Sequence, residues 1–282
     1  MLPVIVKSLL AGSCLAATAM AVTPISDSDM NNLLNAGGVS LAMKAQPMWF
    51  FGQAMNQKPC IPTWATQNGN QQTPSSKLCA WPNAGCDCVT PDKGIGNPSQ
   101  SFPVYYSYQR CAEDSVRVAY NLFFQKDGFT PKGLFGHPYD WERVIVVWKR
   151  TEDSQWRPYE IYLSEHSGYL RRTWDQIQNT FDDSTASQPR GGPEGVKNKD
   201  HAKVYVAWAK HAIYDTRNTG FNDVLSQLTD KAFRSNDWWY FATRDDYIRA
   251  DRSTEIGRLL GTYNWGDASS NPPSVHDGLC TA

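Results

Sequence analysis

The sequence predicts an α+β domain with a central β-sandwich flanked by helices and disulfide-stapled loops. Three observations support this class: β-like runs dominate the middle of the chain, helical apolar spacing appears only later, and cysteines crowd a loop-like segment. Hydrophobic residues make up 41% of the 282 residues, which is enough for a substantial core. The formal net charge of −1 argues against nucleic-acid binding through a broad basic face.

The first 21 residues are typical of a secretory signal peptide. Lys7 supplies the only charge, residues 9–17 are largely apolar, and residues 19–21 (AMA) form a small-residue cleavage site. A membrane anchor is the alternative, but Lys7 and Gly12 leave an apolar run too short to span a bilayer. We therefore expect cleavage after this segment, a secreted extracellular protein, and a single domain over residues 22–282.

Removal of the signal peptide leaves six cysteines, an even number in a chain expected to reach an oxidising compartment. Four of them fall in a segment rich in Pro, Asn, Gln and Gly. Cys86 and Cys88 are too close to pair readily with each other, so each should reach another partner, and their spacing does not match a zinc site. The sequence does not choose among the possible pairings. The disulfide candidates are Cys60, Cys79, Cys86, Cys88, Cys111 and Cys280.

Four runs are expected to form strands. Residues 115–124 alternate between apolar and polar positions, whereas residues 141–149 are apolar on both faces, as in a central strand. Residues 157–166 and 202–211 give two more strands. The segment 188–200 between them, rich in Gly, Pro and charge, predicts a mobile loop.

Helical spacing of apolar residues appears after these strands. Residues 220–233 predict an amphipathic helix packed on the sheet, and residues 253–261 predict a second, short helix. The remainder of the chain is expected to be a loop that Cys280 ties down.

The segment GHPYDWE, residues 136–142, carries several polar groups and runs directly into RVIVVW, one of the most apolar runs of the chain. A connection of roughly ten residues favours antiparallel pairing with the preceding strand, which brings Asp127 close to Asp140 and Glu142 at one sheet edge. Alternation places Asp140 and Glu142 on the same side of their strand. Pro138 is expected to break the ladder, so that His137 lies in the incoming turn and can swing toward the carboxylates.

Carboxylates gathered at a sheet end repel one another unless something offsets their charge. Raised pKa values, salt bridges to Arg143 or Lys126, or a hard divalent cation would each do so. His166 and His211 end two of the expected strands and could orient metal-bound water, although a lone histidine is more often a surface residue or a satisfied core residue. Asp, Glu and His without clustered thiols favour Mg²⁺ or Ca²⁺ over Zn²⁺. The alternative is a salt-bridged corner without an ion.

The segment GHPYDWE resembles the heptapeptide Gly-His-Arg-His-Asp-Trp-Glu of the necrosis-inducing, or NLP, cytolysins that plant-associated microbes secrete, and matches five of its seven positions. Flanking segments that resemble the family in the same order are AYNLFFQKDGF, EHSGY, KHAIYD, FNDVLSQLTDKA and NWGDASSNPP. The resemblance covers most of residues 39–280, as a divergent, Cys-rich member.

The resemblance implies a β-sandwich with a divalent ion near one end. Asp127 and Asp140 would be direct metal ligands, and His137 and Glu142 would complete the metal site through bound waters or sugar hydroxyls. Residues implied in the outer shell or in head-group binding are His166, His211, Tyr139 and Trp141. With an ion that accepts sugar hydroxyls as ligands, this is a binding site rather than an enzyme active site.

The implied function is that of a monomeric, secreted cytolysin. It would bind sphingolipid head groups of plant plasma membranes through Mg²⁺ or Ca²⁺, permeabilise the membrane, and induce necrosis and immune responses. Pro138 and Tyr139 replace the family's Arg and His. A non-cytotoxic glycan- or lipid-binding protein is therefore the alternative. A metal-dependent hydrolase ranks below both, because no general base or nucleophile stands apart from the carboxylates in the sequence.

Overall fold

The computed structural model describes residues 22–54, 56–68, 70–165, 168–177, 179–182, 197–216 and 238–282. The expected signal peptide, the expected helix at 220–233 and most of the expected loop at 188–200 lie outside the described residues.

The helices are α1 (Asp27–Asn35), α2 (Val39–Lys44), α4 (Glu255–Leu260) and α5 (Pro272–Asp277), with 3-10 turns η1 (Trp174–Gln176) and η3 (Arg244–Asp246). The long strands are β6 (Val104–Ala112), β7 (Ser115–Gly128), β8 (Gly136–Arg150) and β9 (Gln155–Glu165). The shorter strands are β1 (Ile25–Ser26), β2 (Met48–Phe51), β3 (Thr66–Gln67), β4 (Gln71–Gln72), β5 (Asn97–Pro98), β10 (Gly168–Thr173), β11 (Thr180–Phe181), β12 (His201–Val206), β13 (Ile213–Tyr214), β14 (Trp238–Tyr240) and β15 (Tyr247–Arg249).

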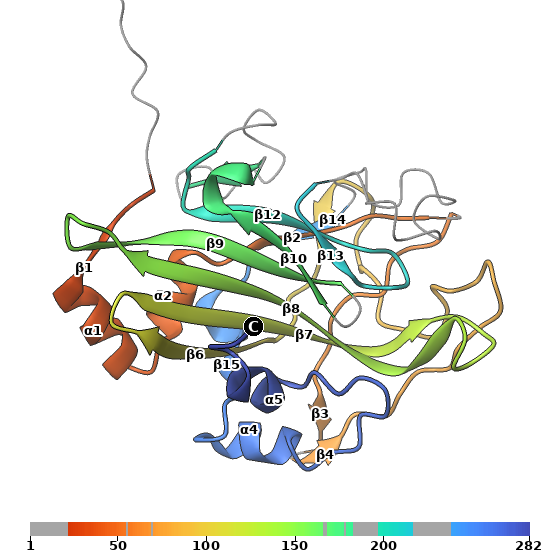
Figure 1. Ribbon diagram of the computed structural model, residues 1–282. Coiled ribbons are helices and arrows are strands. Elements are labelled where there is room, and N and C mark those ends of the chain that lie inside the picture. The colour runs from red at the N-terminus through yellow and green to blue at the C-terminus, as the bar shows by residue number, and fades with distance from the viewer. Residues whose placement is uncertain are drawn as a thin grey trace, which may run out of the picture.

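Two large sheets form the described fold (Figure 1). The first has seven strands in the order β1-β9-β8-β7-β6-β15, with β10 beside β9. The second has six strands in the order β11-β12-β2-β14-β5, with β13 beside β12. β3 and β4 form a separate small hairpin. The predicted strands at 115–124, 141–149 and 157–166 are confirmed as β7, β8 and β9, and the expected sandwich class is confirmed.

The two sheets bury one shared apolar cluster between them. Val144 and Val146 of β8 belong to the same buried cluster as Trp49 of β2 and Val204 of β12. Because side chains alternate along a strand, these positions of β8 lie on its inner face. The sheets therefore pack face to face through large apolar side chains, as in a sandwich.

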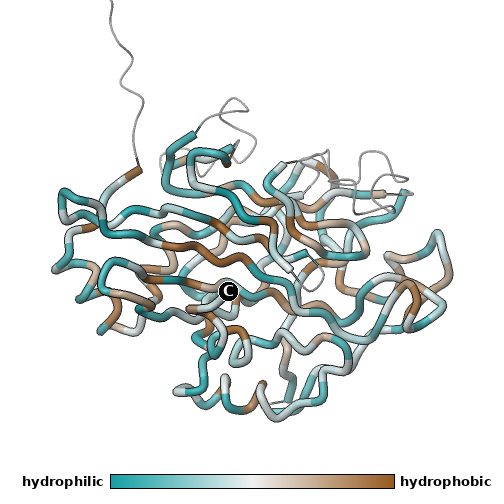
Figure 2. Tube along the Cα trace, viewed as in Figure 1, coloured by the Kyte–Doolittle hydropathy of each residue, from teal (hydrophilic) through white to brown (hydrophobic). Residues whose placement is uncertain are grey.

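The outer face of the large sheet is also buried, by the C-terminal helices. Ile145 and Val147 of β8 share a second cluster with Val275 and Leu279, in and after α5. Figure 1 shows α4 and α5, in blue, along this sheet. Figure 2 shows apolar stretches along the middle of the central strands and polar residues at many of the bends. The expectation that residues 141–149 are apolar on both faces is thus confirmed, and helices supply the second cover.

Two expectations about the end of the chain had different outcomes. The short helix expected at 253–261 is confirmed as α4, which Thr254 caps by accepting a hydrogen bond from the Gly257 amide. The loop expected after it is wrong in part, because α5 forms there. Asn271 caps α5, and Pro272 occupies its first turn, where a missing amide donor costs nothing.

The expected strand at 202–211 is too long at its C-terminal end. β12 ends at Val206, and a turn follows in which Ala209 and His211 have positive φ angles of 67° and 55°. Left-handed backbone ends a strand even where the side chains remain apolar.

The disulfides join Cys60 to Cys88, Cys79 to Cys86 and Cys111 to Cys280. As expected, Cys86 and Cys88 do not pair with each other, and Cys280 ties down the C-terminus. Three disulfides fit an extracellular protein. In the part of the chain that the structure describes, no helix has both the length and the apolar character needed to cross a membrane.

Gly128, at the end of β7, has a φ angle of +68°, and a Cβ atom there would collide with the Phe135 carbonyl across the hairpin. We expect Gly128→Ala to lower the free energy of unfolding by roughly 3 kcal/mol, from left-handed strain and the backbone clash together. Gly133→Ala is the matched control, because its φ is +82° but its Cβ would meet nothing within 4 Å. That variant should lose only about 1 kcal/mol. Urea unfolding with intact disulfides measures both, and equal losses would contradict the clash.

Candidate metal and ligand site

The β7–β8 hairpin brings the predicted carboxylates together. Its antiparallel register places Asp127 opposite His137 and Phe124 opposite Asp140. The predicted antiparallel pairing is therefore confirmed, and the carboxylates of both strands lie near the open end of the sheet.

One expectation about this hairpin is wrong. Pro138 does not break the ladder, and His137 does not lie in the turn: both residues belong to β8, where Pro138 pairs with Lys126. β9 first pairs with β8 at Val144, so Pro138 lies where β9 does not cover this edge of β8. Proline is tolerated at such an edge because, on the side that β9 does not cover, no strand requires a backbone amide.

The turn after β12 delivers a third group. The Gly128 amide donates to the Ala209 carbonyl at 2.7 Å, which docks the turn on the end of β7. The His211 ring then stacks on Phe124, with ring centroids 3.8 Å apart and planes 4° apart. Only 1% of His211 is exposed, so its position is set by packing.

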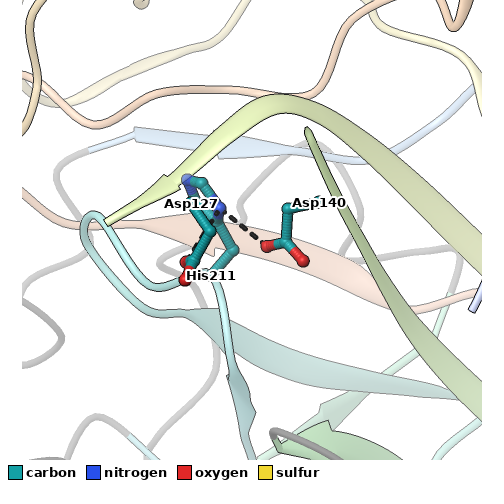
Figure 3. Close-up of side chains that lie close together, drawn as sticks. All are labelled: Asp127, Asp140 and His211. Atoms are coloured by element: carbon teal, nitrogen blue, oxygen red, sulfur yellow. Dashed lines mark hydrogen bonds and ion pairs between the residues drawn. The ribbon is translucent and has the colours of Figure 1, made fainter. Parts of the chain in front are cut away.

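Asp127, Asp140 and His211 converge in one buried group (Figure 3). His211 Nδ1 lies 2.9 Å from Asp140 Oδ2 and 4.0 Å from Asp127 Oδ1. One ligand atom from each residue lies within 4.8 Å of the others. The spacing and the chemistry of these atoms could hold a metal ion.

Further polar groups surround this trio. Lys210 Nζ lies 3.3 Å and His137 Nε2 lies 3.6 Å from Asp127 Oδ2. Ser164 Oγ donates a short hydrogen bond to Glu142 Oε2. The groups open into a cavity of about 340 Å³. Its lining includes the three carboxylates, His137, Arg143, Lys210 and the loop 267–270.

Burial opposes the ionised form of these carboxylates. Desolvation and, second, the neighbouring Asp140 charge raise the pKa of Asp127 to about 6, against the opposing effect of Lys210. Desolvation raises the pKa of Asp140 to about 7, and it raises the pKa of Glu142 well above the usual value. Two acidic groups that titrate near neutrality in one cavity are typical of a functional site.

His211 is neutral in this environment, because desolvation lowers its pKa to about 3. A neutral imidazole has one N–H donor, and the Nδ1 position next to Asp140 Oδ2 assigns the proton to Nδ1. His211 therefore donates to Asp140 and fixes the orientation of that carboxylate.

The donor set suits a hard divalent cation. Asp127 Oδ1 is buried and has no hydrogen-bond partner among the described residues, and it lies 4.0 Å from His211 Nδ1. A buried carboxylate oxygen without a donor is costly, and a cation would offset that cost together with the charge repulsion. The group therefore fits the predicted divalent ion, while the assignment of individual ligands stays a prediction.

The predicted site residues fall into three sets. The cavity lining brings together four of them: Asp127, Asp140, His137 and Glu142. His211, predicted for the outer shell, lies close enough to the two aspartates to be a ligand itself. His166 lies outside the described residues.

Tyr139 and Trp141 form the third set and pack into an aromatic cluster with Trp265, at centroid distances of 5.4 Å for each. Trp141 also lines the cavity, whereas Tyr139 does not. Tyr139 has a φ of 60°, and its carbonyl lies 2.9 Å from His137 Nδ1.

Sequence reasoning missed Lys210 and the loop 267–270 as cavity residues. Lys210 is the first residue of the segment KHAIYD, and loop 267–270 falls within the segment NWGDASSNPP, so both lie within segments that the family resemblance used. The offset suggested for Lys126 is not formed among the described residues: its amine donates instead to the carbonyls of Lys77 and Cys86.

The model of the necrosis inducing protein (NPP1) family matches residues 55–265, which include this hairpin and the turn that carries His211. The chain belongs to this family. NLP effector proteins 7 and 9 of Phytophthora capsici are each 27% identical to it over 199 residues, which is 69% of this chain and 52% of theirs. The chain thus spans about half the length of the curated relatives it matches.

Solved structures that resemble this NPP1-family chain share less than a fifth of its residues. Necrosis and Ethylene inducing Protein 2 from the causal agent of cocoa's Witches Broom disease has 18% identity and a TM-score of 0.46, with 93% of each chain covered. Non-toxic HaNLP3 has 17% identity and a TM-score of 0.45, covering 81% of this chain and 83% of its own. NLPPya in complex with mannosamine has 18% identity and a TM-score of 0.43, covering 88% of each chain.

Proton competition predicts a steep pH dependence of cation binding. At pH 8 both aspartates are largely ionised, and as the pH falls through their raised pKa values of about 7 and 6, protons compete with the cation. Between pH 8 and pH 5, we expect the affinity for Ca²⁺ or Mg²⁺ to fall roughly a thousandfold, because both carboxyls must lose a proton to bind the ion. Calorimetric titration at several pH values measures this change. A site of ordinary exposed carboxylates, with pKa values near 4, would instead show little change over this range.

Proposed function

We propose that this protein binds a divalent cation, Mg²⁺ or Ca²⁺, between Asp127 and Asp140 and uses the cavity to engage sugar head groups of plant-membrane sphingolipids. On this proposal it is a secreted, monomeric cytolysin that permeabilises the membrane and induces necrosis and immune responses. The observation that carries the proposal is the buried group of Asp127, Asp140 and His211 at an open polar cavity, in a chain of the NPP1 family.

The cation would supply positive charge and exchangeable coordination positions for hydroxyl oxygens. The chain's own residues perform the remaining tasks. Asp127 and Asp140 provide anionic oxygens, and His211 holds Asp140 in one orientation through Nδ1–H. Stacking on Phe124 in turn fixes the His211 ring. No bond is made or broken in this mechanism, so we propose a binding protein rather than an enzyme.

The rim of the cavity would select the ligand. Lys210 and Arg143 place positive charge at the cavity, which suits a phosphate-bearing head group. Glu142 and the serines at 269 and 270 offer acceptors and hydroxyls for sugar. Anionic lipid and sugar can therefore be recognised at the same opening.

A second candidate is a non-cytotoxic glycan- or lipid-binding protein. The observation in its favour is that Pro138 and Tyr139 stand where the family has Arg and His. Tyr139 packs against Phe123 and Trp265, so its ring is used in the fold and is not offered to a ligand in the cavity. Binding would then occur without lysis.

We expect Asp140→Asn to weaken Ca²⁺ and Mg²⁺ binding at least tenfold, because one anionic ligand is lost at nearly constant shape. Asparagine Oδ1 still accepts from His211, so the melting temperature should not fall. Calorimetry with the cation, and dye release from vesicles of plant plasma-membrane lipids with and without chelator, measure the two activities. Both should be lost in the variant.

Asp114→Asn is the matched control, because Asp114 is exposed, directly precedes β7 at the end far from the cavity, and pairs with Lys149 on the surface. This variant should behave as the wild type. Dye release that persists in Asp140→Asn, or in chelator, would contradict the cytolysin mechanism. Cation-dependent sugar binding by a wild type that releases no dye would favour the second candidate.

A further inference from the structure

The tip of the β7–β8 hairpin, residues 129–135, is apolar although it faces solvent. Leu134 is 69% exposed and Phe135 is 42% exposed. The only charged residue of this segment, FTPKGLF, is Lys132. Exposed large apolar side chains that cluster in this way mark an interaction surface.

The tip is held firmly from behind. The Phe135 ring stacks on Phe129 with centroids 5.2 Å apart and planes 12° apart. Trp81 packs against Phe129 at 5.2 Å and against Trp208 at 6.2 Å, and 37% of Trp81 is exposed. The Thr130 amide also donates to the Cys79 carbonyl at 2.9 Å. Leu134 and Phe135 are therefore presented on a supported aromatic platform.

The tip is continuous with the cavity. Asp127 and His137, which line the cavity, form a cross-strand pair at the base of the tip. Trp208, which packs against Trp81 behind the tip, lies two residues before Lys210 of the cavity. Figure 1 shows β7 and β8, in yellow-green, extending together past the other strands of their sheet. A ligand in the cavity that is attached to a surface would bring that surface next to the tip.

We propose that the tip at 129–135 inserts into the interface of a lipid bilayer and anchors the cavity at the membrane. The proposal rests on the proposed head-group function, and it adds an apolar contact that does not depend on the cation. Leu and Phe side chains favour the boundary between the head groups and the acyl chains, and a Trp side chain such as Trp81 favours the head-group level. The segment has one positive charge, on Lys132, and no acidic residue, which suits an anionic lipid surface.

The test compares variants of the mature protein for binding to vesicles of plant plasma-membrane lipids. We expect L134S/F135S to weaken vesicle binding roughly thirtyfold. Binding of Ca²⁺ and of free glucosamine, measured by calorimetry, should stay unchanged, because neither side chain lines the cavity. Leu134→Ser alone avoids loss of the Phe129 contact, and it should weaken vesicle binding roughly fivefold without a lower melting temperature.

Two further variants identify the partner. L134M/F135L keeps the apolar character but changes the shape, so a lipid should bind it within about threefold of the wild type. Tyr159→Ser is the control, because it removes an exposed aromatic side chain far from the tip. The neighbouring residue, Pro158, pairs with Trp148 at the other end of β8. This position lies roughly 40 Å along the strand from Gly136, so the control should bind as the wild type.

The outcomes separate the two proposals. Loss of vesicle binding in Asp140→Asn with no change in L134S/F135S would overturn the anchor and leave the head-group function standing. If the wild type binds vesicles but no cation, and L134S/F135S no longer binds vesicles, the head-group function alone is overturned. If L134M/F135L binds vesicles as weakly as L134S/F135S does, the partner is not a lipid. The same conclusion follows if the wild type is a dimer and L134S/F135S is a monomer.

Discussion

The register of β7 against β8 is the constraint on which the site depends. It places Asp127 opposite His137 and Asp140 two positions before Glu142 on one side of β8. A slip of one residue would move these carboxylates to the other face of the sheet, and it would turn Val144 and Val146, which share their side of β8, away from the core. The large apolar side chains on both faces of β8 make such a slip costly. The core therefore positions the polar site, and Trp141 and Ala268 belong both to a buried apolar cluster and to the cavity lining.

The same register explains why so much charge can be kept in one place. Strand pairing and sheet packing force Asp127, Asp140 and Glu142 into a desolvated position, and the raised pKa values show the cost. The chain offsets part of this cost with Lys210, with Ser164 and with a neutral histidine that donates to Asp140. A site that binds a cation benefits from this arrangement, because the ion removes a repulsion that the fold maintains.

The cavity and the hairpin tip are consecutive parts of one element. Moving from Asp140 back along β8, the chain passes from buried carboxylates through His137 to the exposed Leu134 and Phe135. The disulfide between Cys79 and Cys86 lies behind this element, and Lys126 ties the Cys86 carbonyl to β7. The Cys-rich segment, which the sequence presents as a separate loop region, thus supports the hairpin that carries the site.

The sequence alone determined the strands β7, β8 and β9, the antiparallel pairing of β7 with β8, and the approach of Asp127 to Asp140, because these follow from local periodicity and a short connection. It also contained five of the seven residues of the family heptapeptide. Tertiary structure decided what depends on contacts between distant segments. The turn that carries His211 is docked by Gly128 and Phe124, more than eighty positions away in the chain. Pro138 stays in its strand because β9 does not reach it. The Tyr139 ring packs against the Trp265 ring. Periodicity encodes which face a side chain takes along its own strand, but it does not encode which remote segment will meet that face.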